Sequence, residues 1–531
     1  MDVAFGSRLP SDLEHAVSVS MPKWDQTLAF EEKDPVYANK MLTGYPRYYL
    51  QPPTREVGQY LQRSLDEDFE LFRPFASAQS AEKCVQYVKQ RLGPDARVLK
   101  QVHTIGCTGK DHLQVAGIFA SGDEAPLVQE YWKFSGEVMS TRFATFVLSQ
   151  LQRKPDLEVP QFLAACRREE EMGASAKVAL RERIVDRYSK RVSHKDVFFF
   201  ASGMSTIFST RKMILAWTAL QSEDISTHST VVIGFPFKDT PAVMDRFGPN
   251  HFYGLGDSRD IDQLENLLQR GETRVAAVFT ETPSNPLLRF TDLGRIRRLA
   301  DRYNFCFVID DTIGGLNIDI LGFADIVCTS LTKLFNGASN ALAGSLVVNP
   351  SSKFHGFAVS YFSSSEIEDL LWCQDAVVLE RNSRDFQART LQTNANTEKL
   401  LKDVLLPELG TIFKNIHYPS LHPESKVNYD AVKTETGGYG CLLSLTFFEE
   451  ESARRFYDSL NVCKGPSLGT NFTLAVPFVL LAHYEELDHV YDSYGVERNL
   501  VRVNVGLEDV EKLILIFRVA IDKARATDNS S

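Results

Sequence analysis

Apolar strand-like runs alternate with amphipathic helical runs between residues 166 and 350, and this alternation constrains the fold more than any other feature of the chain. The strand-like runs include DVFFFAS, STVVIGF, VAAVFTE, FCFVIDD, ADIVCTS and GSLVVNP, and helical segments such as IDQLENLLQR and LGRIRRLADRYN lie between them. Near-continuous apolar strands separated by helices are typical of a parallel sheet covered on both faces. We therefore expect a large α/β domain over residues 166–350.

A second and a third region flank this domain. Residues 1–165 begin with a segment rich in Pro and aromatic residues, GYPRYYLQPP, and continue with helical SAEKCVQYVKQRLG and strand-like ARVLKQVHTIG, which indicate an α+β extension. Residues 351–531 contain the helical stretch EIEDLLWCQDAVVLERN, the strand candidates YGCLLSLTF and LVRVNVG, and a closing helix EDVEKLILIFRVAIDKA. They indicate a smaller C-terminal α+β domain.

The composition is that of a globular enzyme rather than of a nucleic-acid or membrane protein. Apolar residues make up 44% and charged residues 24% of the chain, as in ordinary soluble domains. A net charge of −11 argues against nucleic acid or an anionic membrane as a partner. The eight cysteines form no CxxC motif, no run of 18 residues is apolar throughout, and the start MDVAFGSRLPSDLEHAV has no targeting pattern. We expect a cytoplasmic location.

Polar residues follow the strand-like runs, at the edge of a parallel sheet where ligands bind. In the loop after VFFF, Gly203 and Met204 start a helix whose N–H groups could bind a phosphate, although such a turn can also be merely structural. In the loop ETPSNPLL, Glu281 and Asn285 lie among prolines, which is also compatible with a rigid turn.

Two further loops carry ionisable groups. Asp310 and Asp311 end the strand-like FCFVID segment, and burying a carboxylate is costly unless it meets a cation. A metal ion is one possibility, but no nearby His or third carboxylate completes a ligand set, and a protonated heterocyclic nitrogen fits better. Lys333 follows ADIVCTS with Ser330 and Thr332 beside it; it is either a surface lysine or a desolvated amine with a lowered pKa.

Taken together, a phosphate-binding turn, an acid for a pyridinium nitrogen and a hydroxyl-flanked lysine are the parts that a pyridoxal 5′-phosphate (PLP) enzyme needs. The motifs SGM, ETPSNPLL, VIDDT, ADIVCTSLTKLFNG, PSLGTNFTL and VRVNVGLEDVEKLI resemble the Cys/Met-metabolism PLP-dependent enzymes of fold type I. Within that family, the long N-terminal region with HAVSVSMP and TGYPRY is most similar to fungal cystathionine gamma-synthases and their relatives in specialised metabolism.

The resemblance implies a role for individual residues. Lys333 would hold the cofactor covalently and move protons, Asp310 would pair with the pyridine nitrogen, and Arg502 would bind the substrate α-carboxylate. Ser467, at the lysine-orienting position, and Glu281 would also belong to the substrate-binding residues. The phosphate would be bound by the backbone of Gly203 and Met204 and the hydroxyls of Ser330 and Thr332, and Asn285 would lie near the ring oxygen O3′.

In the family, a Tyr-x-Arg pair from a neighbouring subunit completes the phosphate site. Tyr45 and Arg47 in GYPRYY are the candidates, and the segment YWKFSGEVMS is an alternative that lacks the arginine. The resemblance therefore implies a homodimer or homotetramer with active sites at the subunit interface. It also leads us to expect that residues 1–165 take part in subunit contacts.

The reaction implied is γ-replacement on an O-acyl-L-homoserine, and the nucleophile is left open. Cysteine would make the protein a cystathionine synthase, and a carbon nucleophile such as a β-keto acid would make it an enzyme of specialised metabolism. Phe237 stands where relatives carry a Tyr that stacks on the ring, and Pro466 replaces the usual Glu, although that looks like a branch feature. Because Phe has no hydroxyl to help deprotonate a thiol, we hypothesise a nucleophile other than cysteine. The N-terminal pattern argues against a cystathionine lyase, and the intact Lys333 argues against a catalytically silent scaffold.

Overall fold

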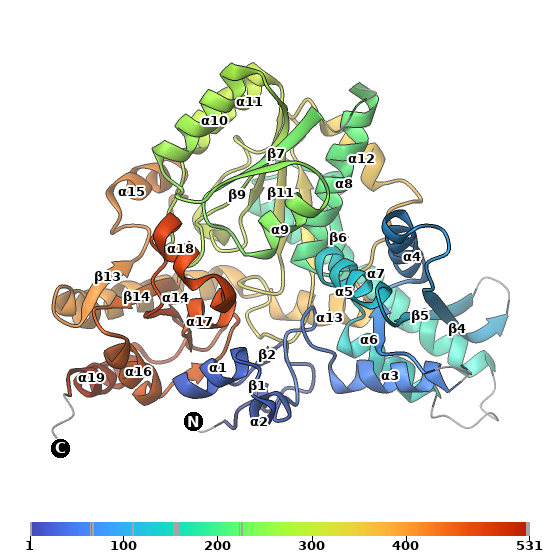
Figure 1. The fold of residues 1–531 in the computed structure, drawn as a ribbon, viewed down its shortest axis with the longest axis horizontal. Coiled ribbons are helices and arrows are strands. Elements are labelled where there is room, and N and C mark those ends of the chain that lie inside the picture. The colour runs from blue at the N-terminus through green and yellow to red at the C-terminus, as the bar shows by residue number, and fades with distance from the viewer. Residues whose placement is uncertain are drawn as a thin grey trace.

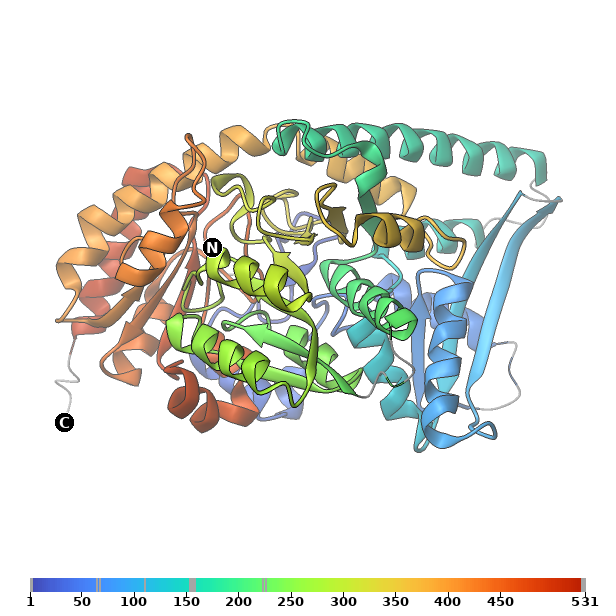
Figure 2. The same cartoon turned by 90° about the horizontal axis from the view of Figure 1, so that it is seen from above.

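The structure is a computed structural model of the chain, and it describes residues 3–526 except 64, 66–67, 109–110, 152–158, 222–223 and 225–226. A seven-stranded sheet lies at the centre, with a five-stranded sheet built from the C-terminal part and a three-stranded sheet built from the N-terminal part on opposite sides of it (Figures 1 and 2). Within the described residues, no helix combines the length and the apolar character needed to cross a membrane.

The central sheet is mostly parallel, as the sequence predicts. In spatial order it contains β6 (Val197–Phe200), β12 (Gly344–Val348), β11 (Ile326–Ser330), β10 (Cys306–Asp310), β9 (Arg274–Glu281), β7 (His228–Ile233) and β8 (Asn250–Tyr253). β12 runs antiparallel to both of its neighbours, and the remaining pairs are parallel. The fold class is therefore confirmed: an α/β fold with a mostly parallel sheet.

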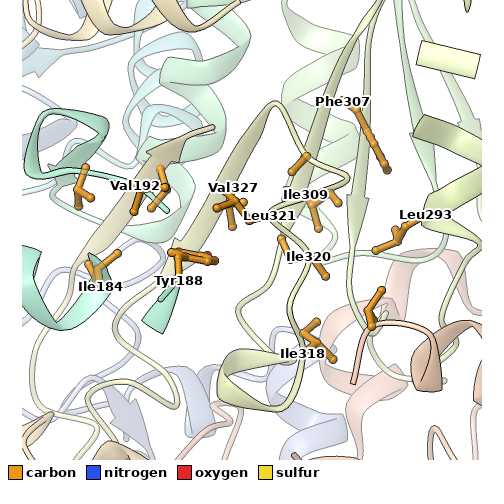
Figure 3. Packing of buried hydrophobic residues seen from close by; sticks show 14 of the residues in the cluster. Ile184, Tyr188, Val192, Leu293, Phe307, Ile309, Ile318, Ile320, Leu321 and Val327 are labelled. Atoms are coloured by element: carbon orange, nitrogen blue, oxygen red, sulfur yellow. The ribbon is translucent and has the colours of Figure 1, made fainter. Parts of the chain in front are cut away.

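Helices cover both faces of this sheet because successive strand residues point to opposite faces. In β10, Phe307 and Ile309 enter one apolar core and Cys306 and Val308 enter the other. The helices on the first face are α7 (Val159–Arg187), α10 (Ser258–Arg270), α11 (Leu293–Tyr303) and α13 (Cys373–Asn382). Those on the second face are α8 (Gly203–Gln221), α9 (Asp239–Arg246) and α12 (His355–Phe362). Figure 3 shows part of the first core, with Ile309 and Val327 of the sheet beside Leu321.

The C-terminal sheet is mixed and packs against helices on one side. Its strands, in spatial order, are β13 (Phe413–His417), β14 (Leu442–Phe447), β17 (Leu500–Asn504), β16 (Leu474–Val476) and β15 (Cys463–Lys464). Its core contains residues of α14 (Phe386–Leu400), α16 (Glu450–Ser459) and α19 (Val510–Arg525). This matches the expected small α+β unit.

The N-terminal sheet is antiparallel, with strands β3 (Leu71–Phe75), β5 (Asp111–Ala120) and β4 (Leu99–Thr108). It is accompanied by α3 (Pro52–Gln62), α4 (Ala78–Leu92), α5 (Glu124–Ser135) and α6 (Thr141–Leu151). α5 packs in the same apolar core as α8 of the central sheet. The predicted domain boundary at residue 165 falls inside the long helix α7, so the boundaries themselves stay a prediction.

The first fifty residues do not belong to this N-terminal α+β unit. They form the short strands β1 (Arg8–Leu9) and β2 (Ser18–Val19) and the helix α1 (Trp24–Glu31), which lie against the C-terminal sheet. Trp24 is 1% exposed in the core of that sheet, and its backbone N–H donates to Asp458 Oδ1 at 2.8 Å. The Tyr457 hydroxyl donates to the Met21 carbonyl at 2.5 Å. The N-terminal segment therefore reaches across the molecule.

We expect Trp24→Ala to weaken the docking of this segment by about 3–5 kcal/mol, the usual cost of removing a buried indole. Limited trypsin digestion should then cleave the first fifty residues faster than in the wild-type protein. Leu42→Ala is a matched control, because Leu42 lies in the same segment but is 62% exposed. Equal protease resistance of the two variants would contradict the packing described.

Candidate active site

The loops that the sequence singled out meet at one edge of the central sheet. Strand register places Asp310 opposite Glu281 on one side and opposite Cys328 on the other, so the carboxyl ends of β9, β10 and β11 lie side by side. Ser330 ends β11, and Lys333 follows it in a tight turn. The structure thus gathers three of the predicted loops around Lys333.

The amine of Lys333 lies in an environment that disfavours its charged form. Its Nζ donates to Ser467 Oγ at 3.2 Å and lies 4.8 Å from the centre of the Tyr45 ring. Loss of solvent lowers the pKa of Lys333 from 10.5 to about 7, with the positive charges of Arg502 and Arg47 acting in the same direction and Glu281 opposing. At neutral pH a large fraction of this amine is therefore unprotonated and nucleophilic.

Arg502, on β17, is the second cation of the site, and it is 2% exposed. Its Nη2 donates to the carbonyls of Pro466 and Ser467 at 2.7 and 2.9 Å, and its Nη1 donates to Asn285 Oδ1 at 3.1 Å. Burial lowers the pKa of Arg502 to about 9, against the raising effect of Glu281. Ser467 therefore contacts both the lysine, through its hydroxyl, and the arginine, through its carbonyl. Asn285 is engaged by Arg502, and its expected position near O3′ stays a prediction.

The PSLG segment, residues 466–469, approaches Lys333 closely, and this approach depends on a glycine that the sequence analysis did not single out. Gly469 has φ +69°, and a Cβ atom at this position would lie 2.5 Å from the Leu334 nitrogen and 2.9 Å from Lys333 Cβ. Both the conformation and the contact require glycine. The only sequence signal is its place in the PSLG motif.

The two adjacent acids differ in their partners. Asp311 is fully buried, pairs with Arg187 and accepts a hydrogen bond from Thr329 Oγ1 at 2.5 Å. Asp310 accepts from the Thr312 backbone N–H at 2.9 Å, and no cation among the described residues forms an ion pair with it. Burial raises the pKa of Asp310 to about 6. Asp310 is thus the acid that remains available for a cationic ligand.

The predicted phosphate-binding residues also lie together. A Cβ atom on Gly203 would lie 2.5 Å from Ser330 Cβ, so only glycine lets the start of α8 approach the end of β11 this closely. The first N–H groups of a helix, here those of Gly203 and Met204, have no partner within the helix and can bind an anion. Thr332 Oγ1 accepts from the Ala343 N–H at 3.0 Å.

The GYPRYY segment reaches the same place. The Tyr45 side chain shares a hydrogen bond with Thr332, and the Arg47 guanidinium lies 5.4 Å from the centre of the Phe237 ring. The resemblance implies that this pair serves a neighbouring subunit, but here it lies in the site of its own chain. Phe237 is fixed by its backbone N–H, which donates to Glu281 Oε2 at 2.6 Å. Burial raises the pKa of Glu281 well above its usual value.

Sequence reasoning missed Asp239, which binds this segment. It is 1% exposed and forms an ion pair with Arg47 at 3.0 Å and with Lys133 at 3.2 Å. The Tyr48 hydroxyl also donates to it, at 2.5 Å. Lys133 belongs to YWKFSGEVMS, so both candidate segments meet at Asp239. The only signal in the sequence is the acid's place two residues after Phe237, at the start of a helix.

Comparison with known proteins identifies the family. The chain matches the family described as Cys/Met metabolism PLP-dependent enzyme over residues 180–522. It is 36% identical to cystathionine gamma-synthase of Saccharomyces cerevisiae, over 98% of this chain and 99% of that protein, and 33% identical to a cystathionine gamma-synthase-like enzyme of Amanita muscaria, over 98% of each. The crystal structure of cystathionine gamma synthase from Xanthomonas oryzae pv. oryzae has a similar fold, with a TM-score of 0.53 and 22% identity over 62% of this chain and 82% of that one.

This chain therefore belongs to the Cys/Met metabolism PLP-dependent enzymes, and its cofactor is PLP. The residues present fit that cofactor. The desolvated amine of Lys333 suits the aldehyde of PLP. The carboxylate of Asp310 suits the pyridinium nitrogen. The start of α8, where Gly203 allows a close approach, suits the phosphate.

Substituting each of the two adjacent acids should change the free energy of unfolding in opposite directions, measured in cofactor-free protein at pH 7.5. Asp311→Asn should cost about 3–5 kcal/mol in urea unfolding, because Arg187 loses its buried counter-ion. For Asp310 the folded pKa lies above the unfolded one, so its ionisation lowers stability once the pH exceeds about 4. Asp310→Asn should therefore be neutral or stabilising. An equal loss in both variants would refute the distinction between the two acids.

Proposed function

We propose that this enzyme catalyses γ-replacement on an O-acyl-L-homoserine: the acyloxy group leaves Cγ as a carboxylate, and a nucleophile takes its place. The observation that carries this proposal is the position of Ser467, whose hydroxyl accepts a hydrogen bond from Lys333 and whose carbonyl accepts one from Arg502. One residue thereby fixes a proton-transferring amine relative to a carboxylate-binding guanidinium, as an α-amino acid substrate requires. Relatives named cystathionine gamma-synthase and cystathionine gamma-synthase-like enzyme support the reaction class.

Each residue would act through its own chemistry. Arg502 would bind the α-carboxylate, and PLP, when bound, withdraws electrons from the substrate Cα. Lys333 would take the proton from Cα and move protons at Cβ, a task suited to an amine whose pKa is about 7, because it both accepts and releases protons at neutral pH. Asp310 would keep the pyridine nitrogen protonated.

The other predicted residues would position the cofactor and the substrate. Gly203, Met204, Ser330 and Thr332 would hold the phosphate together with Tyr45 and Arg47. Asn285 would act near the ring and, through its contact with Arg502, on the carboxylate site. Glu281 would hold the loop that carries Phe237.

We infer that the nucleophile is not cysteine, and Phe237 is the basis for this. Its backbone is fixed by Glu281 and its ring is packed near Arg47, so a phenyl group rather than a phenol faces this part of the site. A thiol has an unperturbed pKa near 8.5 and attacks only after losing its proton. A carbon nucleophile such as a β-keto acid depends less on that hydroxyl.

Cysteine is the second candidate, because a relative that is 36% identical over nearly the whole chain is named cystathionine gamma-synthase. A lyase would instead release a 2-keto acid from cystathionine itself, without an added nucleophile. The resemblance also predicts a homodimer or homotetramer, and the composition and cysteine pattern predict a cytoplasmic location; both stay predictions.

Purified enzyme with O-acetyl-L-homoserine should form a new carbon–carbon product with a β-keto acid, detected by mass spectrometry. Phe237→Tyr should raise kcat/KM for cysteine by about tenfold or more, since it restores an acid–base group. Phe357→Tyr, on α12, is the control and should change neither reaction. Wild-type use of cysteine at about 10⁴ M⁻¹s⁻¹, with keto acids ignored, would establish an ordinary cystathionine synthase instead.

A further inference from the structure

We propose that Arg389 is a positioning residue that holds the turn carrying Lys333 (residues 331–336) and the PSLG segment against each other, and thereby keeps water away from the lysine amine. The inference rests on the proposed role of Lys333 as the amine that holds PLP, and it does not depend on which nucleophile the enzyme uses. Arg389 belongs to α14 and lies far from Lys333 in the sequence.

The guanidinium of Arg389 binds the backbone that directly follows the lysine. Its Nη1 donates to the Leu334 carbonyl at 3.0 Å, and its Nη2 donates to the Phe335 carbonyl at 2.9 Å. The Arg389 side chain is buried, so these are hydrogen bonds from a charged donor inside the protein. Such bonds are stronger than those between neutral groups. The two residues after Lys333 are therefore fixed from the side of α14.

The remaining N–H groups of Arg389 reach three other places, so all five donors of the guanidinium are used. Nη1 also donates to Asn471 Oδ1 at 3.0 Å, Nη2 to the Asn382 carbonyl at 3.1 Å, and Nε to Asp385 Oδ1 at 2.7 Å. The Asp385 side chain is 66% exposed, and its charge is therefore partly screened by water. Carbonyl and amide oxygens must supply much of the stabilisation of the buried positive charge.

Asn471 connects these contacts to the segment that carries Ser467. It lies two residues beyond the PSLG segment, and its backbone N–H donates to the Gly337 carbonyl at 2.7 Å. The Gly337 N–H in turn donates to the Lys333 carbonyl at 2.8 Å. Arg389 thus contacts both sides of the junction at which the Ser467 hydroxyl accepts a hydrogen bond from Lys333 Nζ.

The arrangement of these acceptors requires an arginine. They lie on separate parts of the chain, and a planar fork with donors on three nitrogens reaches them together, whereas a lysine presents all its donors from one nitrogen. If the junction loosened, water would reach the Lys333 amine, and its pKa would rise from about 7 toward 10.5. Arg389 therefore affects the charge state of the amine without touching it.

The test measures the rate of covalent PLP capture by the full-length protein at a series of pH values, with borohydride reduction and mass spectrometry to locate the modified lysine. Arg389→Lys keeps the positive charge but loses the fork. We expect it to shift the midpoint of the pH dependence upward by about one unit or more, because the Lys333 amine becomes more hydrated. Arg384→Lys is the matched control: Arg384 lies nearby in the sequence, is 66% exposed and pairs with Glu380, and its replacement should leave the midpoint unchanged.

A wild-type midpoint in folded Arg389→Lys would overturn the proposal, even if the free energy of unfolding fell, because a merely structural role does not move the midpoint. If Arg389→Lys does not fold, Asn471→Ala takes its place. It removes one acceptor of the guanidinium and should shift the midpoint in the same direction by a smaller amount, and an unchanged midpoint would again refute the positioning role. Attachment of PLP to another lysine in the wild type would overturn the assigned role of Lys333, and the inference with it.

The kinetic constants for O-acetyl-L-homoserine give a second readout. Because Arg389 acts through the proton-transferring amine, Arg389→Lys should lower kcat by about tenfold or more and change KM much less. A rise in KM with an unchanged kcat would place the effect on carboxylate binding by Arg502 and would contradict the assignment. Failure of the wild type to turn over this substrate would contradict the proposed function alone, since PLP capture tests the positioning role independently.

Discussion

The removal of water from the Lys333 amine is the constraint on which the site depends. An exposed lysine would remain protonated, whereas this one has a pKa of about 7 because the surrounding protein excludes solvent and places Arg502 and Arg47 nearby. Maintaining this environment costs folding stability, since the unfolded chain binds the proton more tightly at neutral pH. Residues of the central sheet, the C-terminal sheet and the N-terminal segment surround this amine, namely Glu281, Arg502 and Tyr45.

Much of the fold and of the site could be predicted because the signals are local. Apolar runs identify the central strands, and parallel strands bring their carboxyl ends to one edge, so Asp310 and Lys333 could be assigned to one site before the structure was known. The sequence also indicated that a buried carboxylate of this Asp310–Asp311 pair needs a cation. It could not tell which of them meets a cation, because the partner, Arg187, lies far away in the sequence.

The contacts that escaped prediction are long-range ones. Asp239 and Arg47 form an ion pair although they are far apart in the sequence. No local pattern of apolar or polar residues around either one predicts this contact. The start of α13 is a second example of a feature set by long-range packing. The sequence pattern predicts a helix from residue 366 onward, but α13 begins at Cys373. Trp372 instead packs against Phe143 of the N-terminal unit, with ring centres 4.5 Å apart, so tertiary packing overrides the helical pattern there.

The most direct test of the central claim is the pH dependence of covalent PLP capture by cofactor-free protein, trapped with borohydride and mapped by mass spectrometry. The account predicts a single modified residue, Lys333. It also predicts a rate that rises about tenfold per pH unit at low pH and levels off above about pH 7, where the amine is already neutral. A rate that keeps rising toward pH 10, as for a solvated lysine, or attachment of PLP to another lysine, would contradict it.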